Sequence, residues 1–399
     1  MGMRTIVWAA LLASVALLAG CNDDDAGVDL AQSGQTNSAA DTGGNPANAD
    51  GGGDDADDEV AGEDAVEDTN GPSDGFDGPA LQTDAAALDD SLHCTPFEHP
   101  DKPPVLLVHG TTVTGTEQYT TFYTPQLVAR GFDVCIVTYP DRGLGDMQIS
   151  AEYVVHALRA IHAETGRKVA MIGHSQGGLM PRWAIKYWPS AREALADFVM
   201  IAGPNHGTTV ALPAALGERL FDVLQLGGLP IGLVPAVFYQ FAPGSDFETA
   251  LNAGDETPGE IDYTALYTLT DELVQPALPE PTAALDFGQS NPRVSNILLQ
   301  DVCPGHLSDH FLIGTADSLA FALALDAISN DGPADVMRAG GASELCGLLP
   351  VALDELVMPS QAAGLLTVVA STLADPQLAP HLAAAEPPLM AYARDELDR

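Results

Sequence analysis

Residues 169–178 read VAMIGHSQGG, an apolar run that ends in the pattern G-x-S-x-G. The first four residues have the length and apolar character of a buried strand, and an amphipathic helix pattern follows the glycines. A serine on a tight strand-to-helix turn sits in strained backbone with its hydroxyl exposed at the helix N-terminus, and small neighbours let the helix pack close. The pattern predicts that Ser175 is a nucleophile. The alternative is a purely structural glycine-rich turn.

Short apolar runs and helical patterns alternate around this stretch. The runs at residues 104–108, 132–139 and 198–202 have the length of strands, and residues 149–162 give the clearest helical pattern. Strands that are apolar throughout and alternate with helices are typical of a parallel sheet covered by helices on both faces. We therefore expect one α/β domain at residues 93–399, built on a mostly parallel central sheet.

The loop after the first strand pattern supplies candidate oxyanion donors. Residues 109–112 read HGTT, a sequence similar to the HG motif that precedes such donors in serine hydrolases. The expected donors are the backbone N–H groups of Thr111 and Gln176, with the Thr111 hydroxyl as a further candidate. Loss of one such donor typically costs about 2.7–4 kcal/mol of transition-state stabilisation. His109 is expected to shape this loop instead of transferring protons.

The acid of a serine triad is expected downstream of the nucleophile, just past a strand. Residues 263–270 form a strand pattern that ends at Asp271. The side chain of the adjacent Glu272 would point elsewhere from the turn, and Asp262 precedes the strand. Asp271 is therefore the predicted acid, with these two carboxylates as the alternatives.

The base is expected further along the chain, after the acid. His310 follows a strand pattern at residues 297–301 and begins a long helical pattern at residues 311–328. His306 is the alternative base, because it lies four residues earlier in the same loop. We predict that His310 is the base.

The chain is acidic, with 15 Lys and Arg against 56 Asp and Glu among 399 residues and a formal net charge of −41. This composition excludes a nucleic-acid-binding protein, which needs clustered basic side chains to neutralise phosphates. Residues 22–92 hold 20 of the acidic residues and no Lys or Arg. Such a segment cannot bury enough apolar surface to offset its ordering entropy. Residues 21–92 are therefore predicted to be an extended, disordered linker.

The N-terminus has the pattern of an export signal. Arg4 precedes an apolar run at positions 5–18, which is too short to cross a bilayer as a stable helix. The run ends in LAGC, which resembles the bacterial lipobox, although an ordinary signal peptide with a chance cysteine is the alternative. We expect residues 1–20 to be a lipoprotein signal peptide and Cys21 to carry the lipid. The mature protein would then be exported and tethered to the outer membrane or cell surface.

Four cysteines remain after Cys21. An even number in an exported chain indicates two disulfides, for which three connectivities are possible. Sequence order favours Cys94 with Cys135 and Cys303 with Cys346. We find no cluster of ligands that resembles a zinc site, and we expect neither a metal nor an organic cofactor.

Several stretches are similar, in order and spacing, to the family of lipases related to lipase B of the yeast Candida antarctica. The most specific are YTLTDELVQP at residues 267–276 and EPPLMAYAR at residues 386–394. The resemblance covers nearly all of residues 94–395. The other matching stretches are residues 104–115, 175–178, 301–310 and 346–350.

This resemblance implies an α/β-hydrolase fold with a small apolar lid. It also implies a triad of Ser175, Asp271 and His310 and an oxyanion hole at Thr111 and Gln176. The two disulfides that it implies are the two that sequence order favours.

The chain departs from the family at positions that line the substrate pocket. His174 stands where the family has a tryptophan before the nucleophile, and Asn205 replaces an acidic residue. Leu273 and Val274 occupy positions that line the acyl pocket. These four are candidate substrate-binding residues. A third disulfide is missing, because Ala385 stands where one of its cysteines would be.

Two apolar segments are candidates for the lid. Residues 207–260 are rich in Gly, Pro and Leu and fit either a buried helix pair or a cap around an acyl tunnel. Residues 361–373 resemble the helix that covers the pocket in the family. Apolar walls around a polar centre suit uncharged esters.

Together these patterns predict a monomeric serine lipase or carboxylesterase that cleaves lipid or small esters through an acyl-enzyme. One alternative is an acyltransferase that uses the same triad. The other is a surface lipoprotein that keeps the hydrolase scaffold without catalysis.

Overall fold

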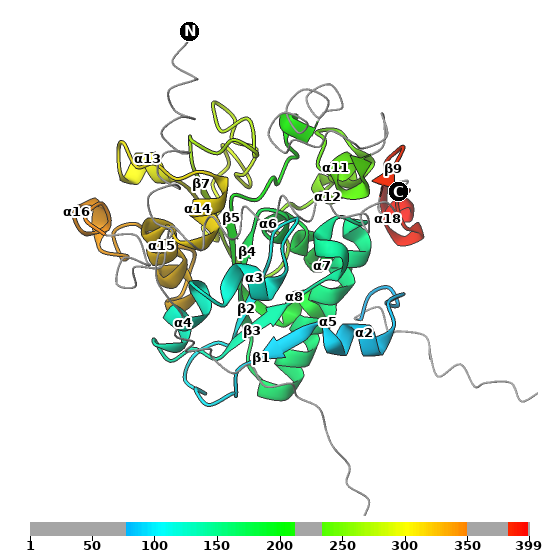
Figure 1. Ribbon diagram of the computed structural model, residues 1–399, viewed down its shortest axis with the longest axis horizontal. Helices are drawn as coiled ribbons and strands as arrows, with labels where there is room; N and C mark the ends of the chain where they lie inside the picture. Colours follow the sequence, from blue (N-terminus) through cyan, green and yellow to red (C-terminus); the bar gives the residue numbers. More distant parts are fainter. Residues whose placement is uncertain (1–76, 212–233, 349–381, 398–399) are drawn as a thin grey trace, which may run out of the picture.

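The computed structural model describes residues 77–211, 234–348 and 382–397. A seven-stranded sheet forms its centre, with the strand order β1-β3-β2-β4-β5-β7-β8 (Figure 1). All neighbouring strands are parallel except β1, which pairs antiparallel with β3. The strands are β1 (Leu92–Cys94), β2 (Val105–Val108), β3 (Val134–Val137), β4 (Val169–His174), β5 (Leu195–Ile201), β7 (Asp262–Tyr267) and β8 (Val294–Leu298).

The central strands are buried on both faces, as their uninterrupted apolar sequences predict. Side chains alternate between the faces along each strand. In β2, Leu106 and Val108 belong to one hydrophobic cluster, and Val105 and Leu107 belong to the other. The sheet therefore separates two cores, which explains why these strands have no polar side.

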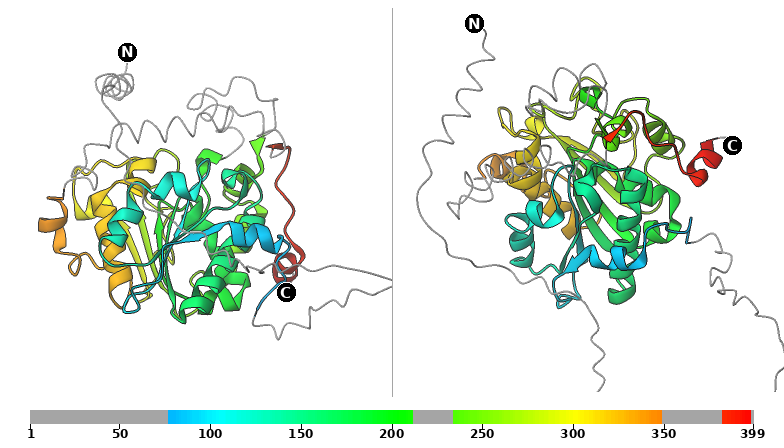
Figure 2. Two further views of the ribbon diagram at one scale, coloured as in Figure 1. Left: turned by 60° about the horizontal axis from the view of Figure 1, so that its bottom comes forward. Right: turned by 45° about the vertical axis from the view of Figure 1, so that its right-hand side comes forward.

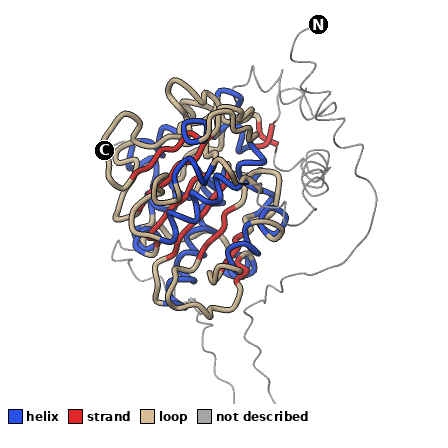
Figure 3. Tube along the Cα trace, turned by 90° about the vertical axis from the view of Figure 1, so that its left-hand side faces the viewer, coloured by secondary structure: helices blue, strands red, loops and turns tan. Residues whose placement is uncertain are grey.

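Helices cover both faces of the sheet, so the expected α/β-hydrolase architecture is confirmed (Figures 1 and 2). In Figure 3 the strands cross the molecule with helices against them. One cluster includes side chains from α2 (Ala85–Asp90), α5 (Met147–Thr165), α7 (Pro181–Tyr187), α8 (Pro189–Glu193), α12 (Asp246–Asn252) and α18 (Ala391–Leu397). The other includes side chains from α3 (Gly115–Tyr119), α4 (Tyr123–Val128), α13 (Leu299–Val302), α14 (His310–Thr315), α15 (Ser318–Ser329) and α16 (Gly341–Leu345).

Shorter elements complete the described chain. The helix α6 follows the nucleophile turn, and a second sheet contains only two strands, β6 and β9. Their bounds, with those of the remaining helical turns, are η1 (Pro140–Gly143), α6 (Gln176–Leu179), η2 (Thr209–Ala211), β6 (Val234–Pro235), α11 (Ala236–Gln240) and β9 (Leu382–Ala383).

The helix predicted at residues 149–162 is α5, and it extends further at both ends. The Asp146 side chain accepts the N–H of Gln148 at 2.9 Å, so the helix begins before the apolar pattern does. Gly166 ends the helix with a φ of 67°, a left-handed conformation that glycine adopts readily.

The strands before the predicted acid and base end differently from expectation. β7 ends at Tyr267, three residues before the predicted end, because the Thr268 hydroxyl accepts the N–H of Thr270 at 3.3 Å and starts a turn. β8 ends at Leu298 and runs directly into α13, so the true strand lies earlier than the one predicted at residues 297–301.

The helix predicted at residues 311–328 is divided into α14 and α15. The Asp317 side chain accepts the N–H groups of Leu319 and Ala320 at 2.9 and 3.0 Å, and thereby begins a second helix. Within the described part of the chain, residues 310–329 are the one segment long and apolar enough to cross a membrane. The segment is 72% buried inside the protein, as a core helix would be.

The end of the predicted linker is ordered. Residues 77–92 include α2, and the Glu152 carboxylate accepts N–H groups of Gln82 and Thr83 at 2.7–3.0 Å. Leu88 is buried in the core. The expectation of disorder is therefore wrong for residues 77–92. The prediction used the average composition of the whole segment, which does not reveal that α2 buries an apolar side chain. The signal peptide, Cys21 and the rest of the linker lie outside the described residues, as do residues 361–373 and much of the predicted cap.

Both predicted disulfides are present. Cys94 and Cys135 lie directly opposite each other on β1 and β3, and their disulfide ties the antiparallel edge strand to the sheet. Cys303 pairs with Cys346, and this disulfide joins the end of α13 to the end of α16.

Candidate active site

Ser175 stands on a strained turn at the carboxyl end of β4. Its φ of 56° and ψ of −119° are unfavourable for a residue with a side chain. Two glycines allow this turn. A Cβ on Gly173 would lie 1.7 Å from the Gly177 carbonyl oxygen, and a Cβ on Gly177 would lie 2.1 Å from the Val108 carbonyl oxygen. The turn thus brings α6 against β2 and leaves the serine side chain partly exposed.

His310 is the first residue of α14, and its Nε2 lies 2.9 Å from the Ser175 Oγ. The Asp309 side chain caps the helix by accepting the N–H of Leu312 at 2.8 Å. His310 is 3% exposed, so most of its imidazole is shielded from bulk water. The structure thus brings together two predicted residues that are 135 positions apart in the sequence.

Asp271 lies on the other side of the imidazole. Its Oδ2 and Oδ1 are 2.9 and 3.1 Å from the His310 Nδ1. Oδ1 also accepts the N–H groups of Leu273 and Val274 at 2.9 and 2.8 Å. Because a carboxylate can only accept, Nδ1 must carry a proton, and Nε2 of the neutral ring is free to accept one from Ser175.

The pKa values of the pair shift in opposite directions. Burial alone would lower the pKa of His310, but the carboxylates of Asp271, Glu272 and Asp309 together raise the net pKa above the usual 6.5. Burial alone would raise the pKa of Asp271, but the His310 ring and the two loop N–H groups hold it below the usual 3.8. Asp271 therefore stays ionised and favours the imidazolium that forms when His310 accepts a proton.

The two predicted oxyanion donors lie on adjacent segments. Thr111 follows β2, Gln176 begins α6, and the Thr111 hydroxyl donates to the Gln176 Oε1 at 3.0 Å. The hydroxyl is thus engaged in holding these segments together. Gly143 has a φ of 70°, and a Cβ there would lie 2.2 Å from the Gln176 Oε1, so this position needs glycine.

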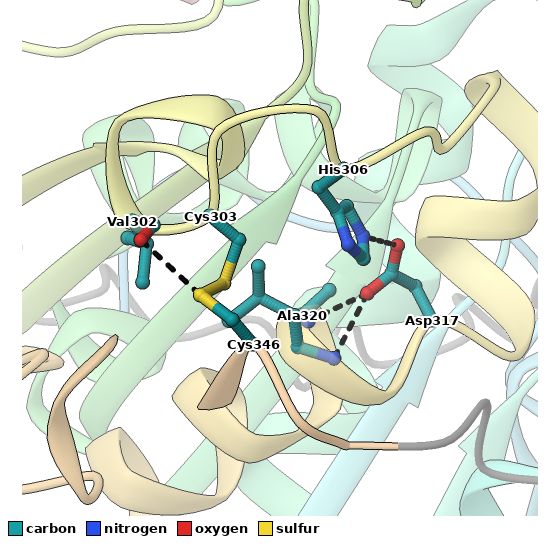
Figure 4. The surroundings of a disulfide bond; sticks show 7 residues. Val302, Cys303, His306, Asp317, Ala320 and Cys346 are labelled. Carbon is teal, nitrogen blue, oxygen red and sulfur yellow. Dashed lines mark hydrogen bonds and ion pairs between the residues drawn. A yellow bond between two sulfur atoms is a disulfide. The ribbon is translucent and has the colours of Figure 1, made fainter. Parts of the chain in front are cut away.

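The alternative base, His306, has a separate partner. Its Nε2 lies 2.7 Å from the Asp317 Oδ2, next to the Cys303–Cys346 disulfide (Figure 4). The hydrogen bond to the Asp317 carboxylate raises the pKa of His306. This pair braces the loop that precedes His310.

The alternative acids also lie elsewhere. Asp262 is at the start of β7 and forms an ion pair with Arg293 at 3.1 Å. Glu272 contacts the base through the backbone, because its Oε2 accepts the His310 N–H at 3.1 Å. Among these carboxylates, Asp271 is the one that contacts the imidazole of His310.

The sequence and the fold can now be compared with known proteins. Residues 102–286 match the family model for class 2 lipases. Lipase B of Pseudozyma antarctica is 32% identical to this chain over 239 residues, which are 58% of this chain and 64% of that lipase. The chain is similar in sequence to lipase B. Its sequence therefore aligns with somewhat less than two thirds of that lipase's length.

The fold supports the same relationship. The crystal structure of Aspergillus fumigatus lipase B has a TM-score of 0.65 and 28% sequence identity to this chain, over 82% of this chain and 75% of that one. The resemblance to the lipase B family that the sequence motifs predict is thus confirmed. The similarity therefore extends beyond the motifs to most of the chain.

The two residues that differ from the lipase B family, His174 and Asn205, are more deeply buried than expected for residues that line a substrate pocket. His174 is 3% exposed and lies beneath α14, where its Nε2 is 2.8 Å from the His310 carbonyl oxygen. Asn205 is fully buried, and its Nδ2 donates to the Ala283 carbonyl at 2.7 Å. Asn205 also contacts the Met200 sulfur at 3.8 Å, and the His174 ring lies 4.9 Å from the His310 ring.

The predicted acyl-pocket residues follow the acid directly. Leu273 is partly exposed, and its carbonyl accepts the Thr208 hydroxyl at 2.6 Å. Val274 is 5% exposed and packs with Tyr267, Ala283 and other residues in a small hydrophobic cluster. Both residues hold the Asp271 carboxylate through their backbone N–H groups.

Sequence reasoning missed the residues that join the acid loop to the base loop. The Gln300 Oε1 accepts the N–H of Leu269 at 3.0 Å, and its Nε2 donates to the His306 carbonyl at 2.8 Å. The Thr270 hydroxyl donates to the Ser308 carbonyl at 2.6 Å. No sequence pattern identifies such polar contacts, because they depend on two loops meeting in space.

Proposed function

We propose that the protein is a serine carboxylic-ester hydrolase, a lipase or esterase that acts on uncharged acyl esters. The hydrogen-bonded row of Ser175, His310 and Asp271 carries this proposal, together with the relationship to lipase B. Nucleophile, base and orienting acid within hydrogen-bond reach of one another are the arrangement that activates a serine hydroxyl.

In the first half-reaction, the Ser175 Oγ forms a bond to the ester carbonyl carbon while the His310 Nε2 accepts its proton. The carbonyl oxygen becomes an oxyanion, which the N–H groups of Thr111 and Gln176 stabilise. The carbon–oxygen bond to the alcohol then breaks, and His310 returns the proton to the leaving alkoxide. Asp271 stabilises the imidazolium throughout.

In the second half-reaction, water attacks the acyl carbon while His310 takes its proton. The bond to Ser175 then breaks, His310 returns the proton to the serine oxygen, and the free acid leaves. No other group is needed to balance these steps.

The apolar character of the substrate is supported by residues near the triad. Leu269 is 44% exposed and Leu307 is 74% exposed, on the loops that carry Asp271 and His310. Leucine side chains in this position favour an apolar acyl or alkyl group over a charged one.

A fluorophosphonate probe tests the proposal. We expect the probe to form a phosphorus–oxygen bond to Ser175 with loss of fluoride, and Ser175→Ala to abolish both labelling and hydrolysis of p-nitrophenyl butyrate. A wild-type protein that folds but is neither labelled nor active would favour the non-catalytic scaffold instead. Product analysis with and without added alcohol separates hydrolysis from acyl transfer.

We also propose that the mature protein is a monomeric exported lipoprotein, tethered through Cys21. The apolar run and the LAGC motif support the anchor, and the acidic segment that follows supports a spacer between membrane and domain. Cys21→Ser should move the protein from the detergent phase to the aqueous phase. Equal partitioning of both forms would refute the anchor, and size-exclusion chromatography of the soluble form tests the monomer.

A further inference from the structure

His310 is held at its backbone as well as at its ring. Its N–H donates to the Glu272 Oε2 at 3.1 Å, and its carbonyl oxygen lies 2.8 Å from the His174 Nε2. Glu272 is the chain neighbour of Asp271, and His174 is the chain neighbour of Ser175. The residues beside the two partners of the imidazole therefore contact the backbone of the same histidine.

We propose that His174 and Glu272 are positioning residues that fix the backbone of His310 and thereby set the distance between its imidazole and the Ser175 hydroxyl. This inference rests on the proposed function and adds two residues to its machinery. A movement of about 1 Å at a reacting group can lower the rate by about two orders of magnitude, so fixing the His310 backbone helps to keep kcat high.

The location of His310 explains why its backbone needs external partners. It is the first residue of a helix of six residues, so its N–H has no acceptor within the helix. A helix this short has little stability of its own. The Glu272 carboxylate supplies the missing acceptor next to the positive end of the helix dipole.

The space around His174 is shaped for its ring. A Cβ on Gly314, one turn along α14, would lie 2.0 Å from the His174 Cδ2, so any larger residue there would displace the ring. On the other side, a Cβ on Gly110 in the oxyanion loop would lie 3.2 Å from the His174 Nδ1. The ring thus fills the space between the base helix and the oxyanion loop.

The protonation state of His174 suits this role. Its Nε2 faces a carbonyl oxygen and must carry the proton, which leaves Nδ1 as a bare acceptor. Burial lowers the pKa of His174 to about 3, and the nearby His310 ring contributes in the same direction. His174 is therefore neutral at working pH and does not repel the imidazolium that forms on His310.

The experiment compares variants that keep or remove each contact, with kcat and KM measured on soluble p-nitrophenyl butyrate. His174→Leu removes the donor at similar volume, and we expect kcat to fall about tenfold or more with KM within about twofold. His174→Gln, whose amide reaches the Nε2 position, should restore most of kcat. His174→Asn, whose amide is too short, should not.

Glu272 gives a second readout. Glu272→Ala should lower kcat about tenfold. Glu272→Gln keeps an acceptor but removes the charge, so it should retain kcat. The acid limb of kcat/KM should move to lower pH in this variant, because the Glu272 charge raises the pKa of His310. Combining His174→Leu with Glu272→Ala should cost less than the product of the two effects, because both contacts hold one residue.

Matched controls separate these effects from general destabilisation. His162 also contacts a backbone carbonyl, that of Arg167 at 2.8 Å, but at the amino end of β4. Glu386 accepts the N–H groups that begin α12 at 2.8 and 2.9 Å. We expect His162→Leu and Glu386→Gln to leave kcat within about twofold.

The outcomes are distinct. If the wild type is active and both His174→Leu and Glu272→Ala have a kcat within about twofold of it, the proposal is overturned while the hydrolase function stands. If His174→Leu does not fold, equal kcat in the Gln and Asn variants overturns the role of His174. A folded wild type without labelling or hydrolysis contradicts the proposed function itself.

Discussion

Replacing Asp271 with asparagine exchanges one carboxylate oxygen for an NH₂ group, and the surrounding loop decides which one. Oδ1 accepts two N–H groups, from Leu273 and Val274 at 2.9 and 2.8 Å, whereas Oδ2 makes the shorter contact to the His310 Nδ1 at 2.9 Å. An NH₂ group in the Oδ1 position would face two donors with no acceptor between them. The carboxamide oxygen must therefore take the Oδ1 position.

The NH₂ group then faces the His310 Nδ1 and donates to it. This moves the imidazole proton to Nε2, where it points at the Ser175 oxygen and blocks proton transfer. We expect kcat to fall about ten-thousand-fold, the loss that the same wrong tautomer causes in a protease triad. At about 1.36 kcal/mol per decade, this corresponds to about 5.4 kcal/mol of activation free energy.

The assay is hydrolysis of p-nitrophenyl butyrate, with the rate of fluorophosphonate labelling as a second measure. The variant should stay folded, because both loop N–H groups keep their acceptor. Asp84→Asn is the control, since the Asp84 Oδ1 also accepts two backbone N–H groups, at 2.9 and 3.4 Å, in a loop before α2. A loss of less than about tenfold in Asp271→Asn would refute the role assigned to this carboxylate.

Three further results are expected. The acid limb of kcat/KM should have a midpoint above 6.5, because His310 must be neutral to accept a proton and its neighbouring carboxylate raises its pKa; a midpoint below this value would contradict the ion-pair geometry. Burial, with nearby carboxylates, raises the pKa of Asp197 to about 7, against about 3.9 in an unfolded chain, so this group destabilises the fold increasingly as pH rises through that window. Urea unfolding should show the wild type losing about 3 kcal/mol more than Asp197→Asn between about pH 5 and pH 9. Gly143→Ala should lower kcat about tenfold with little change in KM, because its Cβ would collide with the Gln176 side chain beside the oxyanion donors; steady-state kinetics that match the wild type would count against that placement.

The turn that carries the predicted nucleophile can be located from the sequence, because its geometry is local. Ser175, its glycines and β4 lie within one short stretch, and the positive φ of Ser175 belongs to the turn that this stretch forms. The buried strands are also predictable, because strands covered on both faces are apolar throughout.

The remainder of the site depends on contacts between distant segments. The strand ends near Asp271 and His310 differ from the predicted ones by a few residues, because a polar turn at Thr268 ends β7 and because α13 follows β8 directly. The edge strand β1 is not predicted, because it has only three residues and begins at Leu92, the last residue of the predicted linker. The sequence places His174 in the substrate pocket, whereas its contact with His310 depends on where α14 packs.

Two buried carboxylates on this sheet show why burial alone does not identify an active site. Asp271 is 4% exposed and Asp197 is 8% exposed, yet their pKa values shift in opposite directions. Asp197 lies near the amino end of β5, where burial and the nearby carboxylates of Asp262 and Asp331 favour the neutral acid. Asp271 lies past the carboxyl end of β7 and faces an imidazole and two N–H groups, so the anion is favoured. Removing a carboxylate from water costs several kcal/mol, and several hydrogen-bond partners are needed to offset that cost. The partners of Asp271 lie at the carboxyl edge of the sheet, where the strained Ser175 also lies.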